Sequence, residues 1–386
     1  MDFIGLLVAL TAIYVAAKGL GELAERIGQP PVLGELVAGV LLGGSVLAIV
    51  NPEETVIRML AELGVLILLF EIGLDSDLGE LLRAGGQSLA VAVAGMAFPF
   101  LFGWGVMAGL GYSSVTSVFV GATLTATSIG ITARVLADMG KLGTMEAKII
   151  IGAAVIDDIL GLVVLSLVRG LAQQGQVSVG GAVRMTLLAI GFFAAAVVGG
   201  RLLAPRLVRI AGRMKVRGVL LVSSLSFAFL VALAAHAIGS ATIVGAFAAG
   251  LVLARTDRKV SIAEQVRPLS DFFVPIFFAT VGAAVDIRFF NPFDPARRRA
   301  LAIAGLLLVA AIVGKCLSGW AAFSRGRRLR HVAIGVGMIP RGEVGLVFAG
   351  LGLTLGVVDA ATYAAVIVVV ILTTFLTPPV LRIALR

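Results

Sequence analysis

Cysteine, histidine, aromatic and charged residues are all scarce in this sequence. Of 386 residues only 14% are charged and 7% are aromatic, and there are two histidines and a single cysteine, Cys316. One cysteine excludes an internal disulfide and any metal site built from several cysteines. The sequence also lacks G-x-x-x-x-G-K and G-x-G-x-x-G, the phosphate-binding motifs of ATP-driven pumps and of NAD-binding domains. We therefore expect no cofactor and no catalytic residues.

Apolar residues are abundant instead. Hydrophobic residues make up 59% of the sequence, the mean hydropathy is +1.08, and 48 residues are glycine. A soluble globular protein does not have this composition, whereas abundant glycine is typical of helices that pack closely inside a membrane. The formal net charge of +9 would suggest a nucleic-acid partner in a soluble protein. Here the basic residues lie in short loops between apolar runs, so we expect a lipid bilayer and no nucleic acid as the partner.

The hydropathy pattern predicts an all-α polytopic membrane protein with about 13 transmembrane helices. The start of the chain lacks a basic region and a small-residue cleavage site, so we expect its first apolar run to be a membrane span rather than a removed signal peptide. The apolar segments are 3–20, 32–50, 59–74, 89–110, 115–136, 149–168, 185–203, 219–238, 242–254, 269–285, 300–324, 332–355 and 363–381.

Lysines and arginines are distributed unevenly between the loops. Most of them follow odd-numbered segments, the last segment included, and few follow even-numbered ones. Short loops rich in Lys and Arg stay on the cytoplasmic side of the membrane. We therefore expect a multi-pass membrane protein with its N-terminus outside and its C-terminus in the cytoplasm.

Two adjacent carboxylates lie in the middle of one apolar segment. Segment 149–168, bounded by Lys148 and Arg169, is apolar except for one serine and the pair Asp157–Asp158. A helix needs about 20 residues to cross the hydrocarbon core, so this pair is expected at mid-membrane. An ionised group there costs about 2.5–3.5 kcal/mol, and such residues are usually functional. A buried pair that is merely neutralised by Lys or Arg is the structural alternative.

The two carboxylates can serve one site. Neighbouring residues on a helix point about 100° apart, so both can face the same cavity. Coupled carboxylates at low dielectric cannot both ionise cheaply. A carboxylate of this kind can hold a proton or a cation but not both, and this competition is the minimum requirement for cation/proton exchange. We therefore predict that Asp157 and Asp158 bind the transported cation and H⁺ in turn.

A lysine is also placed deep in an apolar segment. Lys315 is the only charged residue between Arg299 and Arg325. Its expected counter-charge is Asp157, which leaves Asp158 as the primary cation ligand. Sodium arriving between the acids would weaken the ion pair and allow the lysine to release its proton. The alternative is that the lysine extends to the membrane surface.

The two halves of the chain resemble each other. The glycine pattern around Gly39 recurs around Gly250, and the pattern around Gly73 recurs around Gly282. Corresponding segments are seven crossings apart, an odd number, so the two copies must run antiparallel. This arrangement is an inverted-topology repeat, which is common among secondary transporters.

The same register pairs segments 115–136 and 332–355, the two spans least like ordinary helices. The first contains several Thr and Ser at its middle, and the second contains Pro340 and two nearby glycines. Proline removes a backbone donor, and glycine loosens a helix. Broken helices at matching positions of two repeats point to a binding site. We therefore expect two broken helices that cross near the acids.

Five polar residues at these breaks are candidate supporting residues. Thr127, Ser128 and Thr132 can lend oxygens to the ion, although Ser and Thr in membrane helices also bond to backbone. Arg341 and Glu343 can compensate the dipoles of the half-helices or contact the ion directly. The sequence leaves both alternatives open.

Several motifs together resemble a bacterial sodium/proton antiporter. The sequence is similar to the NapA-like branch of the monovalent cation:proton antiporters, and the similarity covers nearly the whole chain. The residues that carry it are Ala154-Val-Ile-Asp157-Asp158-Ile-Leu-Gly161, Thr125-Ala-Thr-Ser-Ile-Gly130-Ile-Thr-Ala-Arg134, Pro340-Arg341-Gly342-Glu343-Val-Gly345 and Gln29-Pro30-Pro31-Val-Leu-Gly-Glu35-Leu-Val-Ala-Gly39.

The resemblance implies the NhaA/NapA-like antiporter fold, a homodimer and a role in pH homeostasis. It divides each chain into a core (transport) domain, approximately 56–168 and 268–386, and a dimerisation domain, approximately 1–50 and 182–255. The core is expected to move like an elevator against the dimer. The resemblance assigns cation binding and proton exchange to Asp158 and Asp157. It also makes Lys315 the salt-bridge partner typical of electrogenic members, which exchange two protons for one sodium.

Three other functions are weighed against sodium/proton exchange. Potassium/proton antiporters often carry a cytoplasmic nucleotide-binding domain, and none is found within these 386 residues. An intramembrane aspartyl protease needs two acids that face each other from separate helices, which consecutive residues fit badly. A passive cation channel is less suited to a salt-bridged, titrating pair than an exchanger is. We therefore expect a secondary active transporter and not an enzyme.

Overall fold

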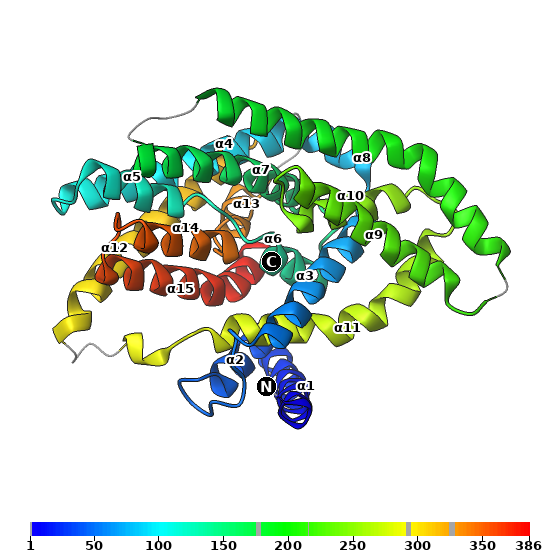
Figure 1. The fold of residues 1–386 in the computed structure, drawn as a ribbon, viewed down its shortest axis with the longest axis horizontal. Helices are drawn as coiled ribbons and strands as arrows, with labels where there is room; N and C mark the ends of the chain where they lie inside the picture. Colours follow the sequence, from blue (N-terminus) through cyan, green and yellow to red (C-terminus); the bar gives the residue numbers. More distant parts are fainter. Residues whose placement is uncertain (1, 175–178, 215, 291–294, 324–328) are drawn as a thin grey trace. The chain divides into compact units, whose positions relative to one another are not determined.

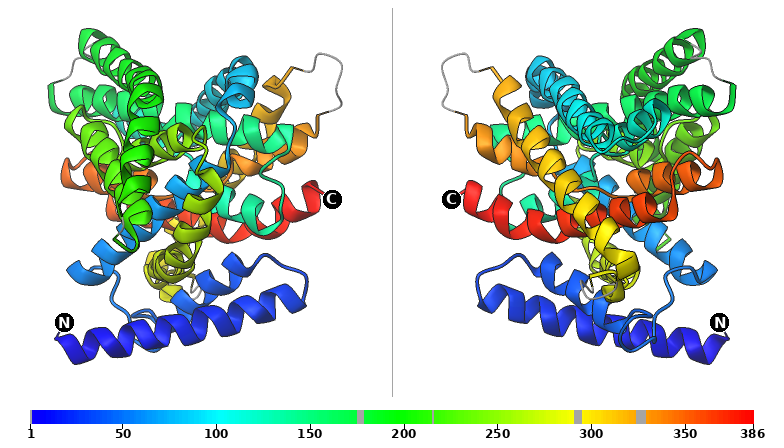
Figure 2. Two further views of the ribbon diagram at one scale, coloured as in Figure 1. Left: turned by 90° about the vertical axis from the view of Figure 1, so that its right-hand side faces the viewer. Right: turned by 90° about the vertical axis from the view of Figure 1, so that its left-hand side faces the viewer.

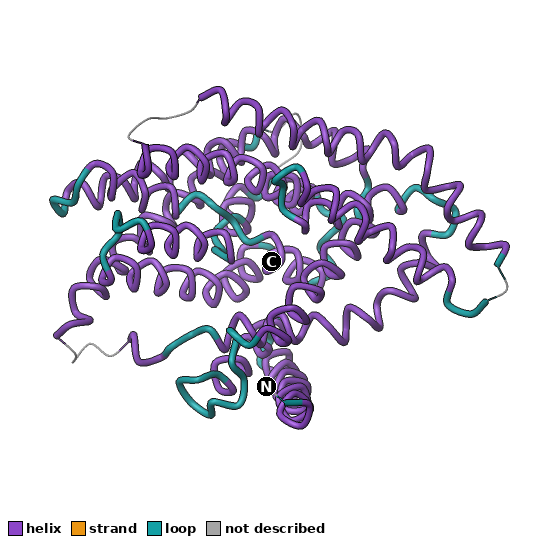
Figure 3. Tube along the Cα trace, in the orientation of Figure 1, coloured by secondary structure: helices purple, strands orange, loops and turns teal. Residues whose placement is uncertain are grey.

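The computed structural model describes residues 2–174, 179–214, 216–290, 295–323 and 329–386. Every element in this described part is a helix (Figures 1 and 3), which confirms the predicted all-α fold there. The α-helices are α1 (Phe3–Arg26), α2 (Pro31–Leu42), α3 (Thr55–Asp75), α4 (Leu78–Gly109), α5 (Ser114–Thr123), α6 (Ile129–Asp138), α7 (Met145–Gln174), α8 (Val179–Arg213), α9 (Val219–Ala237), α10 (Thr242–Leu253), α11 (Lys259–Ala283), α12 (Pro295–Ser318), α13 (His331–Gly337), α14 (Glu343–Thr354) and α15 (Ala360–Ala384). Two short 3-10 helices, η1 (Ile287–Phe290) and η2 (Gly319–Ala321), flank α12.

Each predicted apolar segment overlaps one helix or two consecutive helices. Segment 115–136 is the pair α5 and α6, and segment 332–355 is the pair α13 and α14, so both predicted breaks are present. The last residue of segment 300–324 lies outside the described residues.

One segment was predicted too long. α2 ends at Leu42 instead of continuing to residue 50, and the chain turns back so that the Ala48 amide donates to the Gly43 carbonyl over 2.9 Å. Gly43 lies against α11, where a Cβ atom would be 2.6 Å from the Ala283 carbonyl oxygen. Gly43 and Gly44 are two consecutive poor helix formers, which agrees with the end of α2 at this point despite the apolar residues that follow.

Six helices of the described part are long and apolar enough to cross a membrane, or up to seven if a bent pair within α8 is counted as one span. These six are α1, α4, α9, α11, the helix over Arg298–Ala321 and α15. The shorter apolar helices α2, α5 and α10 add to them. The number of thirteen crossings stays a prediction.

The chain divides into two compact units. Unit 1 comprises Met1–Arg26, Gly34–Leu81 and Met185–Val285, and unit 2 comprises Ile27–Leu33, Leu82–Arg184 and Asp286–Arg386. Helices α3 and α11 therefore belong to unit 1, although the predicted transport domain included most of α3 and part of α11. Compactness does not show which helices move together, so the division into transport and dimerisation domains stays a prediction.

Pairs of glycines bring the helices of unit 1 into backbone contact. α2 meets α11 where a Cβ atom at Gly39 would be 2.8 Å from the Gly282 Cα atom. α3 meets α10 in the same way, because a Cβ atom at Gly73 would be 3.0 Å from the Gly250 Cα atom. These are the four glycines that the two halves of the sequence share. In sequence Gly39 matches Gly250 and Gly73 matches Gly282, whereas in space Gly39 contacts Gly282 and Gly73 contacts Gly250. A two-fold axis that relates the two halves would exchange these two contacts.

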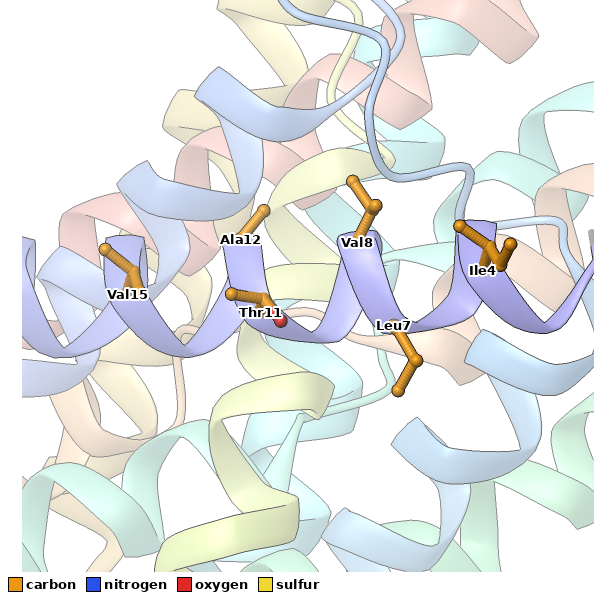
Figure 4. A pocket seen from close by; sticks show the side chains of 6 residues that line it. All are labelled: Ile4, Leu7, Val8, Thr11, Ala12 and Val15. Carbon is orange, nitrogen blue, oxygen red and sulfur yellow. The ribbon is translucent and has the colours of Figure 1, made fainter.

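α1 packs against α2 on one side and exposes an apolar face on another. A Cβ atom at Gly34 of α2 would be 2.2 Å from the Leu20 carbonyl oxygen of α1, so the two helices lie side by side (Figure 2). The exposed face forms a shallow depression of about 500 Å³ (Figure 4), lined by Ile4, Leu7, Val8, Thr11, Ala12 and Val15. Such an apolar face suits lipid or another protein surface.

The helices of unit 2 pack around a core that includes Phe119 of α5 and Phe348 of α14, both fully buried. α14 and α15 lie side by side in this unit (Figure 1). Side chains cap two of the helices, because Ser113 accepts from the Thr116 amide over 3.1 Å and Asp359 accepts from the Thr362 amide over 2.8 Å. Each cap satisfies an amide that has no partner within its helix.

We predict that Gly250→Ala destabilises the protein by about 1–3 kcal/mol, the usual cost of overpacking a core. A Cβ atom there would be 2.2 Å from the Phe70 carbonyl oxygen, and backbone cannot move aside as a side chain can. The measurement is the melting temperature of the purified protein in detergent. Gly19→Ala on α1 is the control, because no atom lies within 4 Å of its Cβ position. Equal melting temperatures for Gly250→Ala and the Gly19→Ala control would contradict the close α3–α10 contact.

Candidate functional site

The two helix breaks are bonded to each other. The first lies between α5 and α6, and the second lies between α13 and α14; both belong to unit 2. The Ser128 amide in the first break donates to the Pro340 carbonyl in the second over 2.7 Å. Gly342 allows the backbone segments of the two breaks to approach each other, because a Cβ atom there would be 2.8 Å from the Ser128 hydroxyl oxygen. The predicted crossing of two broken segments is therefore present, with Ser128 and Gly342 at the point of contact.

Threonine side chains satisfy carbonyl groups that the broken helices leave open. Thr132 on α6 donates its hydroxyl hydrogen to the Gly337 carbonyl at the end of α13 over 2.6 Å. Thr125 bonds to its own chain, donating to the Ala122 carbonyl over 2.7 Å. Proteins tolerate non-helical backbone inside a membrane only when its polar groups find partners of this kind. The structure thus shows that the Thr132 hydroxyl bonds to backbone, and its role as an ion ligand stays a prediction.

Asp157 on α7 and Lys315 on α12 form a buried ion pair. The Lys315 Nζ atom lies 2.8 Å from Asp157 Oδ2, and neither side chain is exposed to solvent. Thr127 from the first break donates to the same Oδ2 atom over 2.5 Å, whereas its contact with the Met338 carbonyl is longer, at 3.4 Å. The other oxygen, Asp157 Oδ1, is buried and accepts no hydrogen bond from the described residues. One oxygen of Asp157 is therefore fully used, and the other can accept a proton or a ligand.

Asp158 lies beside this pair and is also buried, with 7% of its surface exposed. Four ionisable groups are thus enclosed in unit 2 around the crossing: the carboxyl groups of Asp157 and Asp158 and the cationic groups of Lys315 and Arg341. If all four were ionised, their charges would cancel. A balanced set of this kind costs less to bury than an unpaired charge does.

Arg341 holds the two breaks together from the second one. Its Nη1 atom donates to the Ala126 carbonyl over 2.6 Å and to the Thr125 carbonyl over 3.1 Å, just beyond the C-terminal end of α5. A cation at this end of a helix interacts favourably with the helix dipole, as the dipole interpretation of Arg341 expects. The side chain of Glu343, at the start of α14, lies outside the described part of the structure, so its predicted role stays a prediction.

Two residues that the sequence analysis did not select also support the crossing. On α15, the Thr374 hydroxyl donates to the Arg341 carbonyl over 2.9 Å, and the Thr373 hydroxyl oxygen accepts from the Arg341 amide over 3.3 Å. Both threonines are buried. Adjacent polar residues inside the apolar segment 363–381 were the available signal. The bonds fix the backbone of Arg341 and so aim its side chain at the first break.

Comparison with known proteins identifies the family. Residues 6–386 match the family described as "Sodium/hydrogen exchanger, transmembrane". This chain belongs to the sodium/hydrogen exchanger family. As a sodium/hydrogen exchanger it is a multi-pass membrane protein and a transporter rather than an enzyme, which confirms those two predictions.

Individual relatives align with almost the entire exchanger chain. The chain is 46% identical over 412 residues to the high-affinity Na⁺/H⁺ antiporter NhaS3 of Synechocystis sp., and the alignment covers 98% of this chain and 89% of that protein. It is 34% identical over 375 residues to the Na⁺/H⁺-K⁺ antiporter GerN of Bacillus cereus, covering 97% and 94% of the two chains. The sodium proton antiporter MjNhaP1 of Methanocaldococcus jannaschii shares the fold, with a TM-score of 0.71 at 18% identity over 100% of this chain and 96% of that one.

We predict that Thr132→Val destabilises the exchanger by about 1–3 kcal/mol, because the Gly337 carbonyl would remain buried without its donor. Thr132→Ser keeps the hydroxyl and should restore most of the stability. The melting temperature in detergent without sodium reports this effect separately from any contact with the ion. Equal melting temperatures for wild type and Thr132→Val would contradict the structural role of this hydroxyl.

Proposed function

We propose that this protein exchanges sodium (or lithium) for protons across the bacterial inner membrane and that Asp157 and Asp158 bind the two kinds of ion alternately. The observation that carries the proposal is the buried ion pair between Asp157 and Lys315, set beside Asp158 at the crossing of two broken helices. A buried acid paired with a releasable proton donor can exchange that proton for a cation without leaving a charge unpaired. The transported ions are the only small partners proposed, and no cofactor is needed.

We propose an exchange of two protons for one sodium ion. In the proposed proton-loaded state Asp158 carries a proton and the Lys315 ammonium neutralises Asp157. When sodium binds between the carboxylates, Asp158 loses its proton and Lys315 loses another, while Arg341 keeps its charge and its bonds to the first break. Two protons therefore leave for one sodium ion. Exchange in this ratio moves net charge and is electrogenic.

Potassium/proton exchange is the second candidate, and a relative supports it. GerN, at 34% identity, is described as a Na⁺/H⁺-K⁺ antiporter. Carboxylate oxygens bind either alkali ion, so the choice depends on the size of the site. Transport measured with sodium, lithium and potassium in turn distinguishes these functions.

We propose further that the fold is the NhaA/NapA-like one, with thirteen crossings, an inverted-topology repeat and an elevator movement of the transport domain. The paired glycines of unit 1 support the repeat, because Gly39 with Gly282 and Gly73 with Gly250 are equivalent contacts. We also propose a homodimer with the N-terminus outside and the C-terminus in the cytoplasm. The exposed apolar face of α1 is available for a second copy or for lipid.

We predict that Asp158→Asn abolishes sodium-driven proton movement. The amide has the size of the acid but cannot release a proton or carry the negative charge that holds a cation. The measurement is sodium-dependent dissipation of a pH gradient in proteoliposomes, with Asp257→Asn, an exposed loop residue, as the matched control. Full activity of Asp158→Asn would contradict the site, and a wild-type protein that moves no protons in response to any alkali cation would contradict the proposed function.

A further inference from the structure

The Lys315 ammonium has hydrogen-bonding capacity that the ion pair does not use. It carries three N–H groups, and among the described residues it donates to Asp157 Oδ2 alone. The side chain is completely buried, so water at the protein surface cannot serve the other two. A cation that binds to Asp157 competes with the lysine for this carboxylate. A second acceptor within reach of the lysine nitrogen would offset the bond that is weakened or lost.

The backbone of α4 forms one wall of the space around this nitrogen. A Cβ atom at Gly95 would be 3.3 Å from Lys315 Nζ and 3.4 Å from the Ser318 hydroxyl oxygen. A larger residue would therefore press on the ammonium. Glycine at this position lets the lysine nitrogen approach the helix backbone itself.

A proline frees the backbone carbonyl at this point. Pro99 lies four residues after Gly95 within α4 and has no N–H, so it cannot donate the helical hydrogen bond to the Gly95 carbonyl. Carbonyl groups freed by proline inside a membrane are satisfied by neighbouring helices. The Ser318 hydroxyl already donates to the Lys315 carbonyl over 2.7 Å. The ammonium of Lys315 is then the neighbouring donor with hydrogens to spare.

The same proline fixes α4 against the turn of α12 that carries the lysine. A Cβ atom at Gly314 would be 2.7 Å from the Pro99 nitrogen and 2.9 Å from its Cα atom, so the two backbones touch. The turn of α12 that carries Lys315 is therefore held against α4 by direct backbone contact.

We propose that the Gly95 carbonyl is the second acceptor for Lys315, which moves to it when a cation occupies Asp157. The proposal rests on the proposed exchange function and adds a positioning site to it. A neutral amine keeps two N–H groups, so this acceptor serves the lysine both before and after it releases its proton. Because the displaced lysine forms a new hydrogen bond, its displacement costs less free energy and the sodium affinity is higher.

The test restores the missing donor. Pro99→Ala returns an amide hydrogen to α4, which bonds the Gly95 carbonyl within the helix and removes it from the lysine. We expect sodium affinity to fall about two- to tenfold, the size of one lost hydrogen bond between neutral groups. The melting temperature without sodium should stay the same or rise, because an interior proline is removed. Gly95→Ala places a methyl group between α4 and the lysine nitrogen and should also lower the sodium affinity. It replaces Pro99→Ala in the test if that variant fails to fold.

Sodium affinity is taken from the rise of the melting temperature with sodium concentration, which does not require transport. Two matched controls should bind sodium like the wild type. One is Gly105→Ala on the same helix, where no atom lies within 4 Å of the Cβ position, and the other is Pro205→Ala in α8. The decisive comparison is a double-mutant cycle with Lys315→Met, which has no N–H group to donate, or with Lys315→Leu if the first does not fold. In that background Pro99→Ala should no longer change sodium affinity.

Two results would overturn the proposal. One is an unchanged sodium affinity in both Pro99→Ala and Gly95→Ala. The other is an equal loss of affinity with and without Lys315, which would mean that the substitutions act through helix packing. Wild-type protein that binds no alkali cation would instead refute the proposed function, so the two failures are distinguishable.

Discussion

The buried ion pair between Asp157 and Lys315 is the interaction on which the rest of the site depends. Removing two charges from water costs several kcal/mol each, and only close pairing with further hydrogen bonds repays this cost. Lys315 and the Thr127 hydroxyl converge on one carboxylate oxygen. These bonds allow the pair to be buried in the membrane. Because each charge is stabilised by the other, a proton or a cation that binds to Asp157 weakens the bond to Lys315.

The broken helices make room for this pair, and the surrounding polar groups make the breaks possible. Each break exposes backbone groups that a membrane cannot satisfy. Thr132 and Arg341 supply donors to the open carbonyl groups, and Ser128 joins the two breaks directly. The same few polar residues thus hold the backbone and surround the acids. This explains why a substitution at the crossing would affect stability and ion binding together.

Hydropathy and charge predicted much of the fold and the position of the acids, because two carboxylates in the middle of an apolar helix are costly to bury and are seldom present without a function. The pairing of Asp157 with Lys315 was also predictable, since few buried charges are available to choose from. The partners of Arg341 were not, because Ala126 and Thr374 meet it only through the packing of distant helices. The end of α2 was missed for the same reason: its apolar continuation turns at a glycine that contacts α11.

The central claim is that protons and an alkali cation compete for the same buried carboxylates. Calorimetric titration of the purified protein with sodium, repeated in buffers of different ionisation enthalpy, measures the number of protons released for each ion bound. The account predicts a release of about two protons per sodium ion, because Asp158 must lose its proton to bind sodium and Lys315 loses a second one. Sodium binding that releases no protons would contradict it.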